Sequence, residues 1–293
     1  MYRKLFVALI ITSAVCIPAR AEDSSFDSGG VKIHYTVEGQ GDPVILVHGF
    51  IANINLQWRA PGIIKELAKQ YKVIALDNRG HGQSDKPHDP AKYGVEMVED
   101  IVRLMDHLKI QKAHIVGYSM GGFITAKLLA LHPERVRSAT LGGAAWFGET
   151  LTGNLTTIAD SLDNGKGLEP LLVALTPEGE PRPSDEQIKT ISQMALSFND
   201  PKALSAAARG MKKLAVSEDE MKNNRVPTLV LMGDKDPLKA GVEPLQKMKP
   251  NLEVFWQKGA NHMDAFARPE FTKKLVEFLK GVEAAEKGLK KAG

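Results

Sequence analysis

The chain has 293 residues, of which 43% are hydrophobic and 25% charged, so it is long enough for one large α/β domain or two small ones. This balance excludes a disordered, collagen-like or heptad-based protein. The net charge of +3 equals the three basic residues of the first 21 positions, so the remainder has no basic face that would indicate binding to nucleic acid or anionic lipid.

The first 21 residues have the pattern of an export signal. Arg3 and Lys4 form a positive start, and Leu5–Ile17 is a mostly apolar run of 13 residues. Residues 19–21 read Ala-Arg-Ala, the small-x-small pattern that signal peptidase recognises. The apolar run is shorter than the roughly 20 residues needed to span a bilayer, so no stable membrane anchor is expected. We predict cleavage after residue 21 and export to the periplasm or the medium, with a buried N-terminal helix as the alternative.

The only cysteine, Cys16, lies inside this predicted signal. The exported chain would therefore have no disulfide and no thiol chemistry, which suits an oxidising compartment. Lipid modification of Cys16 is an alternative, although the bulky Val15 stands where a small residue is wanted.

The remaining chain alternates short β-branched runs with helical patterns, which is typical of a parallel sheet with crossover helices. Val31–Val37 alternates with period two and ends at Gly-Gln-Gly (39–41), which predicts an edge hairpin. Pro43–Val47 is continuously apolar, as expected of a strand buried on both faces. Further strands are expected at Lys72–Leu76, His114–Val116, Val136–Leu141, Thr228–Met232 and Leu252–Trp256, and helices at Leu56–Lys69, Val95–Leu108, Gly121–Leu131, Val242–Met248 and Pro269–Leu279.

The stretch from about Trp146 to Asn224 contains no convincing strand. Asp200 followed by proline predicts a helix N-terminus, and Ser184 with Gln187 predicts a capping box. We therefore expect a helical insertion.

This insertion predicts a division into a core domain of residues 22–145 and 225–293 and a helical cap of residues 146–224. We expect the cap to select the substrate, with Trp146 as a candidate substrate-binding residue. An insertion that only shields the core is the alternative.

The strongest motif is Gly-Tyr-Ser-Met-Gly at residues 117–121, a G-x-S-x-G sequence. It follows the predicted strand His114–Val116 and opens a predicted helix, which is the context of a nucleophile elbow. Such a turn strains the backbone of the central serine, and side chains at the flanking glycines would collide with neighbouring elements. Ser119 is therefore the predicted nucleophile.

A serine hydroxyl needs a base to become a nucleophile at neutral pH. Of eight histidines, His262 alone follows the last predicted strand and precedes the last helix. Loops at the carboxyl ends of parallel strands converge where ligands bind, so His262 is the predicted base and a capping role in a surface loop is the alternative. The other candidates lie in predicted strands, helices or turns: His34, His48, His81, His88, His107, His114 and His132.

The acid should lie between the serine and the histidine in the chain. Asp234 and Asp236 both follow the predicted strand Thr228–Met232. Asp236 is preferred because it reaches further past the strand end, whereas Asp234 is expected to cap the turn. Asp264 is too close to His262 in sequence and is expected to bond nearby backbone.

An oxyanion hole needs two donors directed at the developing negative oxygen. The amide of Met120 follows the nucleophile, and the amide of Phe50 lies in the loop after Pro43–Val47, where Gly49 would permit the turn and His48 would hold the loop. The run from Asp77 to Ser84 is expected to be a structural turn. A metal site formed by His81 with Asp77 and Asp85 is the alternative, but its spacing matches no ligand pattern, so no metal is predicted.

Taken together, these motifs resemble the α/β-hydrolase superfamily over about Val31–Lys280. The matching sequences are His-Gly-Phe at 48–50, D-x-R-G-H-G-x-S at 77–84, G-x-S-M-G-G at 117–122, Gly233-x-x-Asp236 and His262. The resemblance implies an α/β fold with a mostly parallel eight-stranded sheet, flanking helices, a helical cap and no cofactor. The turn that contains Ser119 resembles that of the esterase, perhydrolase and C–C hydrolase branches. Haloalkane dehalogenases and epoxide hydrolases carry Asp at the position of this serine, so Ser119 argues against both.

These observations predict a serine hydrolase that cleaves a small or medium carboxylic ester through an acyl-enzyme on Ser119. The alternative is a C–C bond hydrolase or lactonase with the same catalytic residues, because a fold does not determine a substrate. A second alternative is a non-catalytic binding protein on this scaffold, although such proteins would be expected to have lost a catalytic residue. The predicted partner is a small ester-like molecule, and the oligomeric state stays open.

Overall fold

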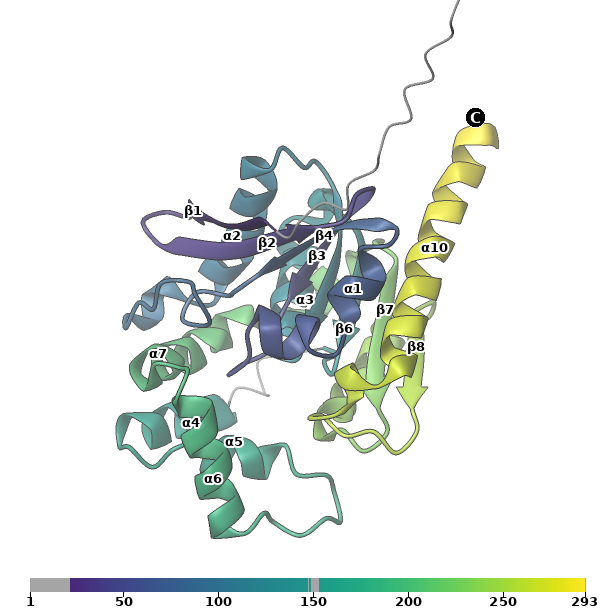
Figure 1. The fold of residues 1–293 in the computed structure, drawn as a ribbon. Helices are drawn as coiled ribbons and strands as arrows, with labels where there is room; N and C mark the ends of the chain where they lie inside the picture. Colours follow the sequence, from purple (N-terminus) through teal and green to yellow (C-terminus); the bar gives the residue numbers. More distant parts are fainter. Residues whose placement is uncertain (1–21, 147, 149–152, 293) are drawn as a thin grey trace, which may run out of the picture.

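The computed structural model describes residues 22–146, 148 and 153–292, so the predicted signal and Cys16 lie outside the described residues. An eight-stranded sheet in the order β1-β2-β4-β3-β5-β6-β7-β8 forms the centre of the molecule (Figure 1). β2 runs antiparallel to β1 and β4, and the other neighbours are parallel. The mostly parallel eight-stranded sheet is confirmed. The strands are β1 (Glu22–Asp27), β2 (Lys32–Glu38), β3 (Asp42–Val47), β4 (Tyr71–Leu76), β5 (Ala113–Tyr118), β6 (Val136–Gly142), β7 (Thr228–Gly233) and β8 (Glu253–Gln257).

The helices follow the strands in the alternating order that the sequence predicts, with one exception. The predicted helix Leu56–Lys69 is wrong as a single element, because Pro61 and Gly62, whose φ is 82°, separate a π-helical turn at 55–59 from α1. The helices are α1 (Ile63–Leu67), α2 (Val95–His107), α3 (Met120–Leu131), α4 (Gly153–Asp163), α5 (Glu169–Ala174), α6 (Asp185–Leu196), α7 (Pro201–Met211), α8 (Glu218–Asn223), α9 (Val242–Met248) and α10 (Pro269–Ala292).

The edge hairpin lies between β1 and β2 and not at the predicted Gly-Gln-Gly turn. β2 does not pair with β3 across the Gly-Gln-Gly turn, because β4 lies between them, and its hairpin partner is β1. No hydrophobic pattern in the sequence indicates β1, because this edge strand directs only one hydrophobic side chain, Phe26, into the core. An edge strand with a single buried position has no hydrophobic period to detect.

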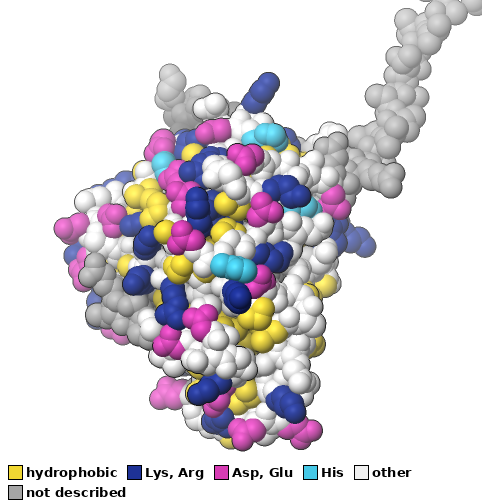
Figure 2. All heavy atoms as spheres, turned by 90° about the vertical axis from the view of Figure 1, so that its left-hand side faces the viewer, with side chains coloured by type: hydrophobic (Ala, Val, Ile, Leu, Met, Phe, Trp, Pro, Cys, Tyr) yellow, Lys and Arg dark blue, Asp and Glu magenta, His cyan; other side chains and the backbone are white. Residues whose placement is uncertain are grey.

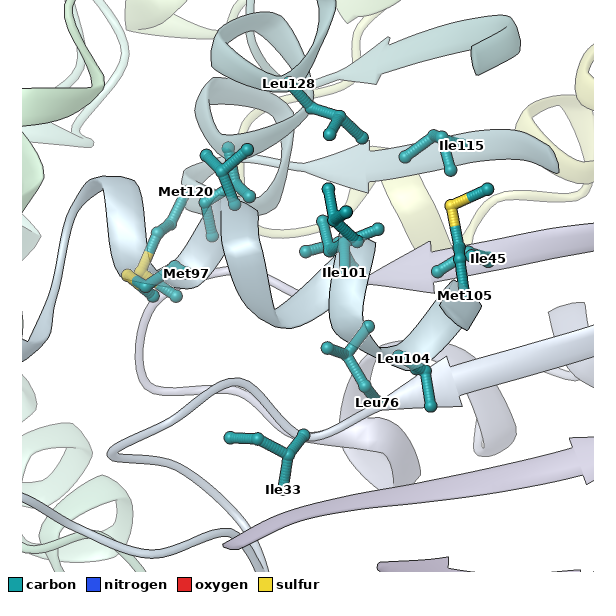
Figure 3. Close-up of a cluster of buried hydrophobic side chains, with 14 of the residues drawn as sticks. Ile33, Ile45, Leu76, Met97, Ile101, Leu104, Met105, Ile115, Met120 and Leu128 are labelled. Carbon is teal, nitrogen blue, oxygen red and sulfur yellow. The ribbon is translucent and has the colours of Figure 1, made fainter. Parts of the chain in front are cut away.

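Two helical layers cover the sheet. α2, α3, α8 and α9 pack on one face, and α1 and α10 pack on the other. Figure 3 shows the first face, where Ile101 and Met105 of α2 lie against Ile45 and Ile115 of the central strands. Each central strand sends alternate side chains to both faces, which explains the continuous apolar runs in the sequence.

Helices α4 to α7, which follow β6 in the chain, form a group beside the sheet (Figure 1). We call α4 to α7 the inserted helices. They share a small apolar core, and the predicted caps are present: Ser184 and Gln187 form a capping box, and Asp200 caps α7. α8 lies in the same part of the sequence but packs on the core, where its Met221 joins the cluster beneath α9.

The described surface mixes charges of both signs. On the face in Figure 2, lysine and arginine side chains alternate with aspartate and glutamate, and no large area of one sign is visible. Among residues 22–146, 148 and 153–292, none of the helices is both long and apolar enough for a membrane span.

Candidate active site

Ser119 lies in a sharp turn between β5 and α3. Its φ of 53° is unusual for a residue with a side chain, and its amide donates to Gly142 O at 2.8 Å. A Cβ at Gly117 would collide with the carbonyl of Gly121, and one at Gly121 would collide with the carbonyl of Val47. The glycines therefore allow α3 to turn back against β5 and β3, which lifts the serine to the carboxyl edge of the sheet.

The side chains of Ser119, His262 and Asp236 form a continuous hydrogen-bonded line. His262 Nε2 lies 2.9 Å from Ser119 Oγ, and His262 Nδ1 lies 2.8 Å from Asp236 Oδ2. Since a carboxylate accepts, Nδ1 carries the proton and leaves Nε2 free to accept from the serine hydroxyl. Asp236 is fully buried and His262 is 4% exposed, so water competes little for these contacts. The geometry can transfer a proton from the serine to the histidine.

The other two aspartates near His262 have different contacts. Asp234 Oδ1 accepts from the amide of Gly259 at 2.7 Å and so ties the ends of β7 and β8 together. Asp264 Oδ1 accepts from the amide of Asn261 at 2.8 Å, and its other oxygen pairs with Arg268. Both carboxylates thus order the loops around His262 without contacting its ring.

Tyr118, which precedes Ser119 in the chain, also holds the histidine loop, a role that was not predicted from the sequence. Its hydroxyl donates to the carbonyl oxygen of His262 at 2.6 Å, and the two rings lie 5.5 Å apart between centroids. Burial raises the pKa of the Tyr118 hydroxyl well above its usual range, so the group stays protonated and can donate. The tyrosine at the first variable position of G-x-S-x-G is visible in the sequence. Its hydrogen-bond partner is 144 residues away in the chain, so the sequence does not reveal the contact.

The loop after β3 lies against Ser119. A Cβ on Gly49 would stand 3.2 Å from Ser119 Cβ, and the Gly49 amide donates to buried Gln57 Oε1 at 3.1 Å. His48 Nδ1 donates to Gly49 O at 2.7 Å, while its Nε2 accepts from the amide of Asn78 at 3.0 Å. A side chain at position 49 would therefore crowd Ser119, and the left-handed residue in this loop is Ile51, with φ 58°.

The run from Asp77 to Ser84 forms a buried turn beside this loop. The Asp77 carboxylate contacts the ring of His34 and accepts from the amides of Ile54 and Gln83, each at 2.9 Å. His81 is also buried, and burial with the neighbouring His48 ring lowers its pKa to about 3, so it is neutral at ordinary pH. Within the described part of the chain, no group of three or more His, Cys, Asp or Glu side chains is arranged to hold a metal ion.

A cavity of about 280 Å³ opens beside Ser119 between the core and the inserted helices. Met120 and Phe50 line it next to the serine, and no Lys, Arg, Asp or Glu is among the described residues of its wall. Trp146 also lines it, and its indole N–H is already bonded to Val216 O at 2.9 Å. The remaining walls are formed by Phe123, Ala145, Asn154, Leu155, Ile158, Leu171, Ala174, Leu175, Ala208, Met211, Pro237, Leu238, Ala240 and Gly241.

Comparison with known proteins decides the family. The chain is 30% identical over 239 residues to the 2-hydroxy-6-oxo-6-(2'-aminophenyl)hexa-2,4-dienoic acid hydrolase of Metapseudomonas resinovorans, and the match covers 78% of this chain and 80% of that protein. A family model described as "alpha/beta hydrolase fold" matches residues 42–168. The chain belongs to the α/β-hydrolase family.

Other similarities extend this result. The α/β hydrolase is 30% identical over 250 residues to the dihydrolipoyllysine-residue acetyltransferase component of the acetoin cleaving system of Pseudomonas putida. That match covers 82% of this chain but 64% of the relative, so the chain spans less than two thirds of that protein's length. Among solved structures, the 2-hydroxy-6-oxo-6-phenylhexa-2,4-dienoate hydrolase of Rhodococcus sp. strain RHA1 superposes with a TM-score of 0.70 at 25% identity, covering 89% of this chain and 99% of that chain.

Proposed function

We propose that this α/β hydrolase is a serine hydrolase whose catalytic residues are Ser119, His262 and Asp236. The observation that carries the proposal is the unbroken hydrogen-bonded line from Ser119 Oγ through the His262 ring to the buried Asp236 carboxylate. His262 takes the hydroxyl proton on Nε2 while Ser119 Oγ attacks a carbonyl carbon. The protonated ring then gives that proton to the leaving group, and an acyl-serine remains. His262 next deprotonates a water, which attacks the acyl carbon and returns the serine hydroxyl.

The negative oxygen of the tetrahedral intermediate would be held by two backbone amides. The amide of Met120 begins α3 directly after the nucleophile, where the helix N-terminus also favours negative charge. The amide of Phe50 lies in the loop that Gly49 brings against Ser119. Removing one such donor typically costs about 10²- to 10³-fold in rate.

The substrate that best fits the cavity is a small or medium uncharged ester. The volume of about 280 Å³ lies at the lower end of ligand sites, and its described walls carry no charged group. A carboxylate held there would lose its hydration without gaining a cation, which is costly. We also propose that the inserted helices act as the cap that selects the substrate, since Ile158, Leu171 and Leu175 supply much of the apolar wall.

The second candidate is hydrolysis of a C–C bond or a lactone by the same residues. The relatives named above as hydrolases of 2-hydroxy-6-oxo-dienoic acids support it, and these comparisons favour it over the ester. The uncharged wall favours the ester or a lactone over a free dienoic acid. The two lines of support therefore point to different substrate charges, which an experiment can separate.

A substrate panel on the purified protein tests the choice. We expect p-nitrophenyl esters and neutral lactones to be turned over, and a 2-hydroxy-6-oxo-hexa-2,4-dienoate to have a kcat/KM at least about tenfold lower. A higher kcat/KM for the dienoate would establish the C–C hydrolase in place of the ester hydrolase. If no substrate reacts and a fluorophosphonate fails to label Ser119, the chain is a binding protein and the catalytic proposal is wrong.

We further propose that residues 1–21 direct export. The support is the basic start, the short apolar run and Ala-Arg-Ala at 19–21. The intact mass of protein recovered from the periplasm or medium should correspond to a chain that begins at Glu22. A cytoplasmic protein that retains Met1 would contradict export, and a lipid on Cys16 would favour the anchored form.

A further inference from the structure

The residue that follows the proposed oxyanion donor has a strained backbone. Ile51 has a φ of 58°, in the left-handed region that β-branched residues rarely occupy. Such a conformation persists only where surrounding contacts hold it, and it often occurs at functional sites. Glycine or asparagine would adopt it at less cost, so an isoleucine here needs a contact that prevents relaxation.

The ends of the loop are tied to the core by hydrogen bonds. On one side the Gly49 amide donates to Gln57 at 3.1 Å, and on the other the Ile54 amide donates to the Asp77 carboxylate at 2.9 Å. Phe50 and Ile51 lie between these ties. If Ile51 relaxed to a negative φ, the direction of the chain would change there, and the Phe50 amide would move relative to Ser119.

The inserted helices supply a tie to the middle of the loop. Asn199, between α6 and α7, donates from Nδ2 to Ile51 O at 3.2 Å and to Ala195 O at 3.0 Å. Asn199 is buried. Phe50 and Ile51 pack against the apolar core of the inserted helices. The bond therefore joins the part of the molecule proposed to select the substrate to the loop proposed to stabilise the oxyanion.

We propose that Asn199 is a positioning residue that holds the strained Ile51 and so keeps the Phe50 amide directed at the oxyanion, which lets the inserted helices influence the chemical step as well as substrate choice. This inference rests on the proposed serine hydrolase function. It differs from a purely structural role in a measurable way, because an oxyanion donor acts on the transition state and not on the bound substrate.

The test compares Asn199→Ala with Asn164→Ala. Asn164, just after α4, is an exposed control whose Nδ2 also donates to the carbonyl four residues earlier, Asp160 O, at 2.7 Å, and no hydrogen bond joins its side chain to the loop. Asn199→Ala removes the bonds to both Ile51 O and Ala195 O, and for a short p-nitrophenyl ester we expect it to lower kcat by about tenfold with KM within about twofold. Affinity for a trifluoromethyl ketone, which forms an anionic adduct with the serine, should fall by the same factor. Asn164→Ala should change neither value by more than about twofold.

A second variant tests whether the bond acts through the strain at Ile51. Asparagine accepts a left-handed backbone more readily than isoleucine, so in an Ile51→Asn background Asn199→Ala should cost less than about threefold in kcat. Equal losses in both backgrounds would overturn the proposal, as would a loss confined to KM or to melting temperature. Complete inactivity of the parent protein towards esters, lactones and the fluorophosphonate would instead reject the proposed function, which separates the two failures.

Discussion

The surroundings of His262 and the inserted helices differ in the contacts that define their geometry. Polar contacts of definite length fix the core site: His262 bonds to Asp236 and Ser119 through its ring and to Tyr118 through its carbonyl. The inserted helices instead share an apolar cluster, and their ion pairs, such as Arg209 with Asp160, lie at the surface. Hydrogen bonds fix position and direction, whereas apolar contacts tolerate changes of shape. The molecule thus combines a site fixed by directional polar contacts with a pocket wall made largely of apolar side chains.

The largest expected effect is on the core side of this comparison. Ser119→Ala removes the nucleophile, so we expect ester or lactone hydrolysis to fall by at least about 10⁴-fold while the circular dichroism spectrum stays unchanged. Steady-state kinetics with a chromogenic ester measure the loss. Activity within tenfold of the parent in a folded variant would show that Ser119 is not the nucleophile.

The next effect distinguishes two carboxylates of one loop. Asp236→Asn should lower kcat by about 10³- to 10⁴-fold, because an amide at this position can stabilise the wrong tautomer of His262. Asp234→Asn, the matched control, keeps an oxygen that can accept from the Gly259 amide and should cost less than about tenfold. The kcat values of the two variants decide the assignment, and a reversed order would make Asp234 the catalytic acid.

A smaller effect is expected at Tyr118. Tyr118→Phe keeps the ring packing but removes the hydroxyl that donates to His262 O, so kcat should fall about tenfold with little change in KM. Tyr35→Phe is the control, since the Tyr35 hydroxyl lies 3.2 Å from the ring of His107, outside the site. Equal kcat values for the two variants would mean that the Tyr118 hydroxyl does not position the histidine.

The smallest effect is expected in the inserted helices. Leu171→Ala removes side-chain volume from the cavity wall and so enlarges the cavity. The ratio of kcat/KM for an octanoate ester to kcat/KM for an acetate ester should therefore rise about threefold to tenfold, while acetate turnover persists. Val173→Ala on the same helix is the control, because Val173 is 40% exposed and does not line the cavity. A ratio that stays within twofold in cavity variants of α4 and α5 would show that these helices do not select the substrate.

Much of the site could be predicted because its signals are local. The glycines of the 117–121 motif act over a few residues, and the structure has the turn, the strained serine and the following helix where the sequence indicated them. The sequence also indicated His262 and Asp236, since both follow strands whose carboxyl ends must meet at one edge of a parallel sheet. The capping box at Ser184 is equally local, as its two bonds join residues three apart.

The tertiary structure decided the features that depend on contacts between distant residues. β1 pairs with β2 at the edge of the sheet and contributes one hydrophobic side chain to the core. The sequence therefore contains no periodic pattern that predicts this strand. The bonds from Tyr118 to His262 and from Asn199 to Ile51 join residues 144 and 148 positions apart, and neither pair has a spacing that a sequence could reveal. The left-handed backbone lies at Ile51 rather than at Gly49, against local preference, in a turn closed by a bond from the Ala52 amide to Gly49 O at 3.3 Å. Local sterics therefore specified the turn at Ser119, and long-range contacts determined how the residues around it are held.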